Sequence, residues 1–252
     1  MKERHAHELL SFSSFVGRLS SPSHTQKWRL SSRSRSGVFF GAVGLVAPSV
    51  AVGLIVAAGF LTPGYDPMKR TISRMAVSGL PAASLVVLGI CLVGVTAIAL
   101  AMGLGPRSSG GRPFLAVAGG ALLLAAAVRL DPGAIRATIE HDSAAAIAVV
   151  ALAAAPLAFA RSHGRVSFAF GAAEVGVLLV GLVLLPTTFA AWGLWERCYL
   201  ALPVVWMFVM SWRLLRTSRM KVSAEETVKA AAASQSNGGE YFPTARVRTA
   251  NE

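Results

Sequence analysis

The run GVFFGAVGLVAPSVAVGLIVAAGFL, residues 37–61, carries no charged side chain. As an α-helix it is long enough to cross the hydrocarbon layer of a membrane, which is about 30 Å thick, with some tilt. The three residues that follow, Thr62, Pro63 and Gly64, are typical of the end of a helix. We therefore predict a transmembrane helix over residues 37–61.

Five further apolar blocks follow the first one along the chain. They cover residues 82–104, 113–130, 143–160, 166–185 and 197–215. The whole chain is 54% hydrophobic and only 14% charged, and its mean hydropathy is +0.58, which is far from the composition of a soluble globular domain. The sequence therefore predicts an all-α fold, a polytopic transmembrane helix bundle with six spans in residues 37–216, and excludes a water-soluble core.

Two polar tails flank this domain. Residues 1–36 are Ser-rich and basic, and we expect them to form a disordered cytoplasmic tail. Residues 217–252 are expected to be mostly disordered, with at most one short helix. Basic residues also lie in the loops after the second and fourth spans, and basic residues favour the cytoplasmic side of a membrane. We therefore predict that both termini lie inside, in an N-in/C-in arrangement.

The net charge of +12 would suggest nucleic acid as the partner of a soluble protein. Here the basic residues lie mainly in the tails and at the ends of apolar blocks, where they orient the chain in a membrane. We therefore expect the lipid bilayer as the main partner and no binding of nucleic acid. The aromatic residues Tyr65, Trp192, Trp195 and Tyr199 are expected to mark the outer membrane interface.

The three predicted outer loops are rich in ionisable and hydroxyl side chains of several kinds. A candidate outer polar cluster consists of Asp66, Arg70, Ser73, Asp131, His141, Glu196 and Arg197. If the six helices form one bundle, these loops meet over its outer end and create a polar site there. The alternative is structural, because charges at helix ends are common and arginines reach toward lipid phosphates without serving a site.

Asp131 and His141 are the pair with the clearest chemical potential. A carboxylate that orients an imidazole can make it a base, although a hydrogen bond that pins the loop is the alternative. Ser73 lacks the Gly-x-Ser-x-Gly context of a hydrolase nucleophile, which favours a cap or turn residue. The catalytic residues, if there are any, stay unidentified at this point.

Glu174 is the one acidic residue well inside a predicted span, so it must be protonated, paired or next to a wet cavity. The histidines do not cluster at ligand spacing, and we expect no metal and no cofactor. Cys91 and Cys198 lie in different spans and are expected to be two small buried side chains with no disulfide between them.

Several short motifs occur in a characteristic order relative to the spans. The motif residues are Tyr65, Asp66, Pro67, Ile72, Ser73, Asp131, Pro132, His141, Gly193, Glu196 and Arg197. In this pattern the chain resembles the bacterial six-span membrane proteins grouped as domain of unknown function 998, over about residues 37–215. One departure is Arg74, which stands where relatives commonly carry an acidic residue. The resemblance implies the six-span architecture and, with the Ala-, Val- and Arg-rich composition, a multi-pass protein of the bacterial plasma (inner) membrane.

The resemblance implies no activity, so three functions stay open. The first is a non-enzymatic membrane protein that binds lipid head groups or a membrane partner protein through the outer polar cluster. The second is an intramembrane enzyme for a lipid or envelope precursor, in which Asp131 and His141 act while Arg70 or Arg197 holds a phosphate. The third is a small transporter, which is disfavoured because the spans lack paired internal charges.

Overall fold

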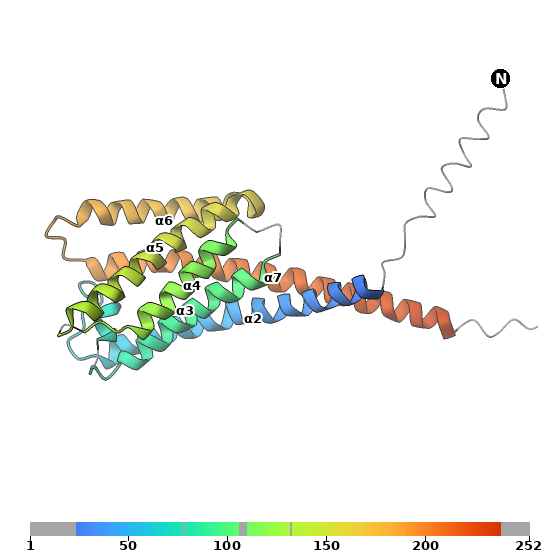
Figure 1. Ribbon diagram of the computed structural model, residues 1–252, viewed down its shortest axis with the longest axis horizontal. Helices are drawn as coiled ribbons and strands as arrows, with labels where there is room; N and C mark the ends of the chain where they lie inside the picture. The colour runs from blue at the N-terminus through green and yellow to red at the C-terminus, as the bar shows by residue number, and fades with distance from the viewer. Residues whose placement is uncertain (1–23, 78, 106–109, 132, 238–252) are drawn as a thin grey trace, which may run out of the picture. The chain divides into compact units, whose positions relative to one another are not determined.

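A computed structural model describes residues 24–77, 79–105, 110–131 and 133–237. Within these residues the chain is helical, and no strand is present (Figure 1). The elements are α2 (His24–Leu61), η1 (Ser73–Ala76), α3 (Ala83–Gly103), α4 (Arg112–Ala127), α5 (Ile135–His163), α6 (Arg165–Leu184) and α7 (Trp192–Asn237). The all-α class predicted from the apolar blocks is confirmed.

Five of the described helices are long and apolar enough to cross a membrane. The candidate spans are Arg35–Leu61, Ala83–Gly103, Ile135–His163, Arg165–Leu184 and a part of α7 within Trp192–Ala231. The remaining helix, α4, has 16 residues and is apolar but shorter than the others. The chain is therefore a membrane-embedded protein by the length and composition of its helices.

Some helices run past the predicted apolar blocks into polar sequence. α2 begins at His24, before the expected boundary at residue 37, and α7 continues to Asn237, beyond residue 215. Backbone hydrogen bonding does not require apolar side chains, and the end of α7 is rich in the helix formers Ala, Lys and Glu. A Glu225–Lys229 ion pair one turn apart, 3.0 Å between Oε1 and Nζ, supports that end. The rest of the two predicted tails, 1–23 and 238–252, lies outside the described residues.

The chain divides into two units, of which Ser36–Arg219 holds the apolar helices. Within this unit α3, α4, α5 and α6 pack one beside the next in chain order. α7 contacts helices on both sides, since Trp195 lies against α6 at Gly181 and Leu215 lies against α2 at Gly41. Trp206 and Phe159 stack in the largest core cluster, with ring centroids 5.6 Å apart. α7 is thus the central helix of the unit.

The seam between α2 and α7 depends on glycine. A Cβ on Gly41 would lie 2.8 Å from the backbone nitrogen of Leu215, so the two backbones approach closely at this level. One turn further along the seam, a Cβ on Gly44 would lie 2.9 Å from the Cβ atom of the Ser211 side chain. α2 and α7 are therefore in close contact in the half of the apolar segment that lies away from the loop between α2 and α3.

The three loops predicted to face outward lie at one end of this unit (Figure 1). They join α2 to α3, α4 to α5, and α6 to α7. The first loop is bonded directly to the start of α7, because the backbone N–H of Leu194 donates to the carbonyl of Met68 at 3.0 Å. The structure therefore brings parts of the predicted outer polar cluster onto a common end of the bundle.

Candidate functional site

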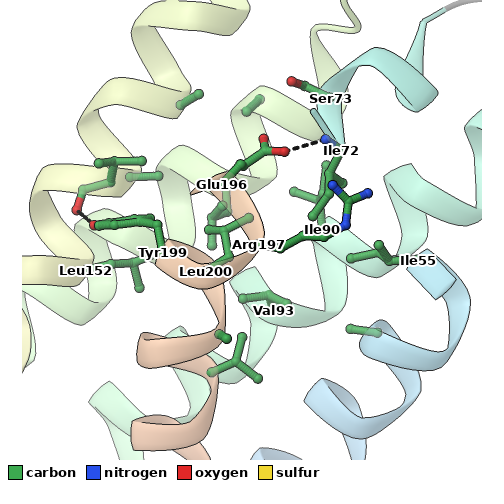
Figure 2. Close-up of a pocket in the computed structure, with 18 of the residues that line it drawn as sticks. Ile55, Ile72, Ser73, Ile90, Val93, Leu152, Glu196, Arg197, Tyr199 and Leu200 are labelled. Atoms are coloured by element: carbon green, nitrogen blue, oxygen red, sulfur yellow. Dashed lines mark hydrogen bonds between the residues drawn. The ribbon is translucent and has the colours of Figure 1, made fainter. Parts of the chain in front are cut away.

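A cavity of about 560 Å³ opens in the loop-side half of the unit. Its wall is formed by side chains of α2, α3, α4, α5, α7 and η1, and most of them are aliphatic. Figure 2 shows Ile55, Ile90, Val93, Leu152 and Leu200 around this space. An apolar cavity with few polar groups has the usual composition of a site for a small hydrophobic molecule.

Four polar residues of the cavity come from three elements at the loop end of the unit, and Figure 2 shows three of them, Ser73, Glu196 and Arg197. Ser73 belongs to η1, His141 to the beginning of α5, and Glu196 and Arg197 to the beginning of α7. We call these four residues the polar end of the cavity. Four members of the predicted outer polar cluster therefore line one space, although they come from three separate regions of the sequence.

Glu196 is held by the backbone of the first loop. Its Oε2 accepts a hydrogen bond from the backbone N–H of Ile72, which directly precedes η1 (Figure 2). The backbone of Ser73 donates a second hydrogen bond to the same carboxylate, so two of its about four acceptor positions are used. Glu196 therefore joins α7 to η1 and keeps acceptor capacity for a further partner.

His141 is buried, with 3% of its surface exposed, and its ring is fixed by the end of α4. Nδ1 lies 2.8 Å from the carbonyl oxygen of Ala125 and 2.9 Å from that of Val128. Carbonyl oxygens only accept hydrogen bonds, so Nδ1 must carry the proton in this arrangement. In the neutral ring Nε2 is then an acceptor or a base, and the described residues give it no hydrogen-bond partner.

Arg197 holds the first loop against the start of α7 through several hydrogen bonds, which together we call the Arg197 clamp. Its Nη1 donates to the carbonyl oxygen of Pro67 at 2.7 Å and to that of Gly193 at 2.8 Å. Its Nη2 donates to the hydroxyl oxygen of Tyr65, whose ring centroid is 5.5 Å from the guanidinium carbon. Tyr65 in turn donates to the carbonyl of Arg70 at 2.9 Å. Most of the hydrogen-bonding capacity of Arg197 is thus used within the protein.

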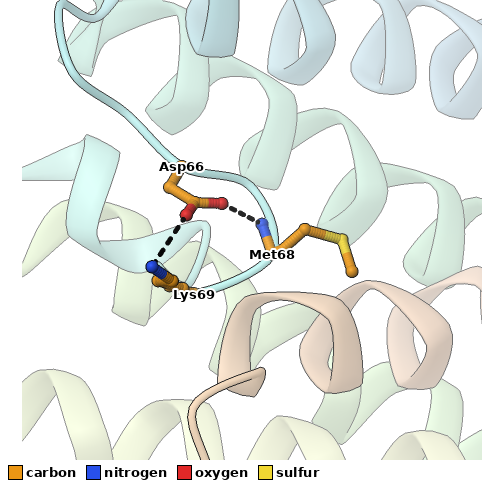
Figure 3. Close-up of polar contacts among 3 residues, drawn as sticks. All are labelled: Asp66, Met68 and Lys69. Atoms are coloured by element: carbon orange, nitrogen blue, oxygen red, sulfur yellow. Dashed lines mark hydrogen bonds and ion pairs between the residues drawn. The ribbon is translucent and has the colours of Figure 1, made fainter.

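Asp66 and Arg70 lie in the same loop but do not line the cavity. Oδ1 of Asp66 accepts the backbone N–H of Met68 at 2.9 Å, and Oδ2 lies 3.7 Å from Nζ of Lys69 (Figure 3). Both partners of this ion pair are exposed to solvent, so the pair contributes little to stability. Asp66 is a turn-forming residue in this arrangement, and Arg70 contributes its backbone carbonyl to the clamp.

Asp131 forms a turn of its own after α4. Its Oδ1 accepts the backbone N–H of Gly133 at 2.9 Å, and the residue is exposed. Among the described residues no hydrogen bond or ion pair joins Asp131 to His141, whose ring is oriented by Ala125 and Val128 instead. The pair that sequence reasoning selected for acid–base chemistry is therefore not assembled in this structure.

Ser73 lines the cavity without forming a catalytic pair. Its hydroxyl lies 3.3 Å from that of Thr71 within the turn before η1. Within the described part of the chain no hydrogen bond connects Ser73 to His141. This arrangement is consistent with the turn residue expected from the sequence and gives no activated nucleophile.

The cavity is open toward the side of the helix bundle. Its most exposed lining residues are on α2 and α7. They are Val52 (49% exposed) and Val56 (53%) on α2, and Val205 (50%) on α7, where Ala201 is exposed as well. The lining residues of α3, α4 and α5 are buried or half-buried. We call these four exposed lining residues of α2 and α7 the side opening.

Sequence reasoning missed two aromatic residues of the wall. Tyr199 was expected at the membrane interface, but it is only 1% exposed and donates to the carbonyl of Val149 on α5 at 2.6 Å. Trp195 also lines the cavity, and its Nε1 donates to the carbonyl of Val177 on α6 at 2.9 Å. Their spacing of four residues puts both on one face of α7, which is the signal that could have identified them.

Glu174 lies on α6 and is fully buried, but it is not part of the cavity wall. Neither of its carboxyl oxygens has a hydrogen-bond partner among the described residues. The same part of the chain contains no group of three or more His, Cys, Asp or Glu side chains that could hold a metal ion. Cys91 and Cys198 are free thiols, but Cys91 is only half-buried and Cys198 is exposed, so the expectation of two buried cysteines is wrong.

Residues 45–213 match a family model described as "Protein of unknown function (DUF998)". The matched range includes all four residues of the polar end. No curated protein and no solved structure matches the chain. The resemblance inferred from the order of the sequence motifs is confirmed.

Proposed function

The chain belongs to the DUF998 family of proteins of unknown function. From the cavity we propose that the protein binds an amphiphilic molecule of the membrane. The apolar part of the ligand lies against the aliphatic wall, and its head group lies at the polar end formed by Ser73, His141, Glu196 and Arg197. The observation that carries this proposal is the separation of an apolar wall from polar groups that lie toward one side of the same cavity.

The size of the cavity supports a ligand of moderate length. Sites for small organic molecules commonly have volumes of about 300–1,000 Å³, and the cavity measures about 560 Å³. Empty apolar space of this size would forfeit the dispersion contacts of its wall. Occupation by a lipid chain restores these contacts, and lipid is the most abundant apolar molecule around a membrane protein.

The side opening gives such a ligand a path. Val52, Val56 and Val205 are about half exposed, and a bilayer would place lipid chains against them. A molecule that enters between α2 and α7 keeps its apolar part in a hydrocarbon environment throughout and moves only its head group past the helices. This path avoids the cost of transferring the chain through water.

The orientation that we propose is the six-span one, with both termini in the cytoplasm of a bacterium and the polar end toward the outer side of the plasma membrane. α4 supplies the sixth span at about 24 Å, taking roughly 1.5 Å per residue for its 16 residues. Basic flanking residues make up the difference by reaching to the interface. Cysteines introduced at Asp131 and at Gly110, each in a background in which Cys91 and Cys198 are replaced by alanine, test this arrangement with a membrane-impermeant maleimide on intact cells. Only the first should react, and labelling of the second alone would reverse the orientation.

The binding function is tested by filling the cavity. Ala145 and Ala146 are neighbours on α5, but only Ala145 lines the cavity, whereas Ala146 is exposed on the surface. In native mass spectrometry of the purified full chain we expect Ala145→Trp to remove a co-purified lipid-class molecule that the wild type and Ala146→Trp retain. Equal lipid retention by both variants, with both proteins folded, would contradict the proposal.

A second function, an intramembrane enzyme for a lipid or envelope precursor, has one observation in its favour. The contacts of Nδ1 with Ala125 and Val128 leave Nε2 of His141 as a base in a cavity that contains Ser73 and Glu196. The phosphate-holding role considered for Arg197 has less support, because its donors already bind the first loop. Conversion of the co-purified molecule by wild-type protein, with binding but no conversion by His141→Asn, would favour the enzyme.

A further inference from the structure

The polar end of the cavity has hydrogen-bond acceptors without a partner and few hydrogen-bond donors that are not already used. A ligand head group that lies there must satisfy these acceptors, because a buried polar group without a partner costs about 1–3 kcal/mol. The chemistry of the head group therefore follows from the atoms that the protein leaves unpaired. This inference rests on the proposed binding function and names the class of ligand.

His141 supplies the first acceptor. Both contacts of Nδ1 are with backbone carbonyls, at 2.8 Å to Ala125 and 2.9 Å to Val128, so the proton stays on that nitrogen. Nε2 of the neutral ring has a lone pair and no proton. The ring cannot turn over to present the other nitrogen without leaving both carbonyls of α4 unpaired.

Glu196 supplies the second acceptor. The backbone N–H groups of Ile72 and Ser73 take two positions on the carboxylate, and its remaining lone pairs have capacity for a donor. Glu196 and His141 belong to different helices and line the same cavity. A donor from the ligand would therefore have two acceptors available at this end.

The one cation of the polar end is largely occupied. A guanidinium has five N–H donors, and those of Arg197 already serve Pro67 and Gly193 through Nη1 and Tyr65 through Nη2. At most two N–H groups are left for a molecule in the cavity. A phosphate monoester, with a charge of about −1.5 to −2, would also be repelled by the Glu196 carboxylate.

The fixed charges of the polar end cancel, since Glu196 and Arg197 contribute one of each sign. A neutral head group adds no charge that would have to be balanced in a cavity of low dielectric constant. A hydroxyl group meets all of these conditions, because it donates to Nε2 of His141 or to Glu196 and accepts from a hydroxyl or guanidinium donor. We infer that the ligand is a long-chain membrane alcohol, recognised through its hydroxyl group by His141 and Glu196.

The test compares four probes with one chain length and different head groups: hexadecanol, its methyl ether, hexadecyl phosphate and hexadecylamine. Binding to the purified full chain in detergent is measured by native mass spectrometry with titration of each probe. Hexadecanol is expected to bind about ten-fold more tightly than the ether, which corresponds to one hydrogen bond to a buried acceptor. It is also expected to bind more tightly than the phosphate and the amine.

Two variants separate recognition of the hydroxyl from folding. His141→Asn keeps an amide donor near the position of Nδ1 and removes the acceptor at Nε2. Glu196→Gln keeps an oxygen for the Ile72 amide and replaces the other acceptor oxygen with a donor. Each variant leaves one of the two acceptors in place, so each is expected to reduce the preference for hexadecanol over the ether, and the double variant is expected to abolish it. Glu140→Gln, the same change on an exposed residue that pairs with Arg136 on the surface, leaves the preference intact.

The outcomes distinguish the two proposals. If none of the probes binds the wild type, and the Ala145→Trp variant does not change lipid retention, the binding function itself is wrong. If the alcohol and the ether bind equally, the cavity binds chains but the hydroxyl inference is overturned. If hexadecyl phosphate or hexadecylamine binds most tightly, the hydroxyl inference is overturned as well, and the ligand has a charged head group.

Discussion

The guanidinium carbon of Arg197 lies 5.5 Å from the ring centroid of Tyr65, and Nη2 of Arg197 donates to the Tyr65 hydroxyl. This relationship joins the start of α7 to the loop after α2, two segments that are 132 positions apart in the sequence. The same side chain binds the carbonyls of Pro67 and Gly193, so one residue determines how the first loop lies over the cavity.

Arg197→Lys is expected to lower the free energy of unfolding by about 2–3 kcal/mol. An ammonium group has no planar fork and cannot reach the carbonyls and Tyr65 together, and hydrogen bonds to charged groups are each worth about 1.5–3 kcal/mol. Thermal unfolding of the purified protein in detergent measures the effect. Arg70→Lys is the control, since only the backbone carbonyl of Arg70 takes part in the clamp. Equal midpoints for Arg197→Lys and the wild type would show that the clamp does not contribute to stability.

Gly193→Ala is expected to destabilise the contact between the first loop and α7. A Cβ at this position would collide with the backbone oxygens of Pro67 and Arg70, which are not flexible ends of side chains. The matched control is Gly176→Ala on α6, where a Cβ meets no atom within 4 Å and the helix gains about 0.5–1 kcal/mol from the exchange. Fluorescence-detected size-exclusion after heating should show a lower midpoint for the first variant and an unchanged or higher one for the second. The opposite order would mean that the loop is not packed on Gly193.

Gly41→Leu is expected to separate α2 from α7. The new Cβ would lie 2.8 Å from the backbone nitrogen of Leu215, and a leucine side chain adds further volume in the same seam. Gly53→Leu is the control on the same helix, because a Cβ there has no neighbour within 4 Å. We expect loss of monodisperse protein for the first variant and normal behaviour for the second in size-exclusion chromatography. Similar yields from both would show that the seam tolerates larger residues.

Glu174→Leu is expected to raise the free energy of unfolding by about 1–3 kcal/mol. It replaces two buried carboxyl oxygens that have no hydrogen-bond partner among the described residues with an apolar side chain of similar volume. Glu174→Gln keeps buried polar atoms and is expected to give no such gain. The comparison is made by thermal unfolding in the same detergent. A midpoint lowered by leucine but not by glutamine would reveal a bound water or another partner of the carboxyl group.

The apolar blocks of the sequence were sufficient to predict the helices. The run at 37–61 and four of its five successors coincide with helices that are long and apolar enough to cross a membrane, and the run at 113–130 coincides with the shorter apolar helix α4. Helix length and hydrophobicity are local properties that need no knowledge of neighbours. The same local reasoning selected Ser73, His141, Glu196 and Arg197 as polar residues near helix ends, and the structure places all four on one cavity. The helix ends in polar sequence, such as the extension of α7 to Asn237, were not predicted because apolar periodicity stops there while backbone hydrogen bonding continues.

Only the tertiary structure decided which of these residues share a site and what each one binds. Asp131 was paired with His141 by sequence proximity, yet Asp131 accepts the N–H of Gly133 while His141 donates to carbonyls of α4. The partner of Glu196 is the backbone N–H of Ile72, 124 positions earlier, and nothing in either local sequence specifies that contact. The physical reason is that a polar group in a membrane protein must find its hydrogen-bond partners inside the fold, so its role depends on which helices pack around it. Residue type and position along the chain determined the candidates, and helix packing determined the site.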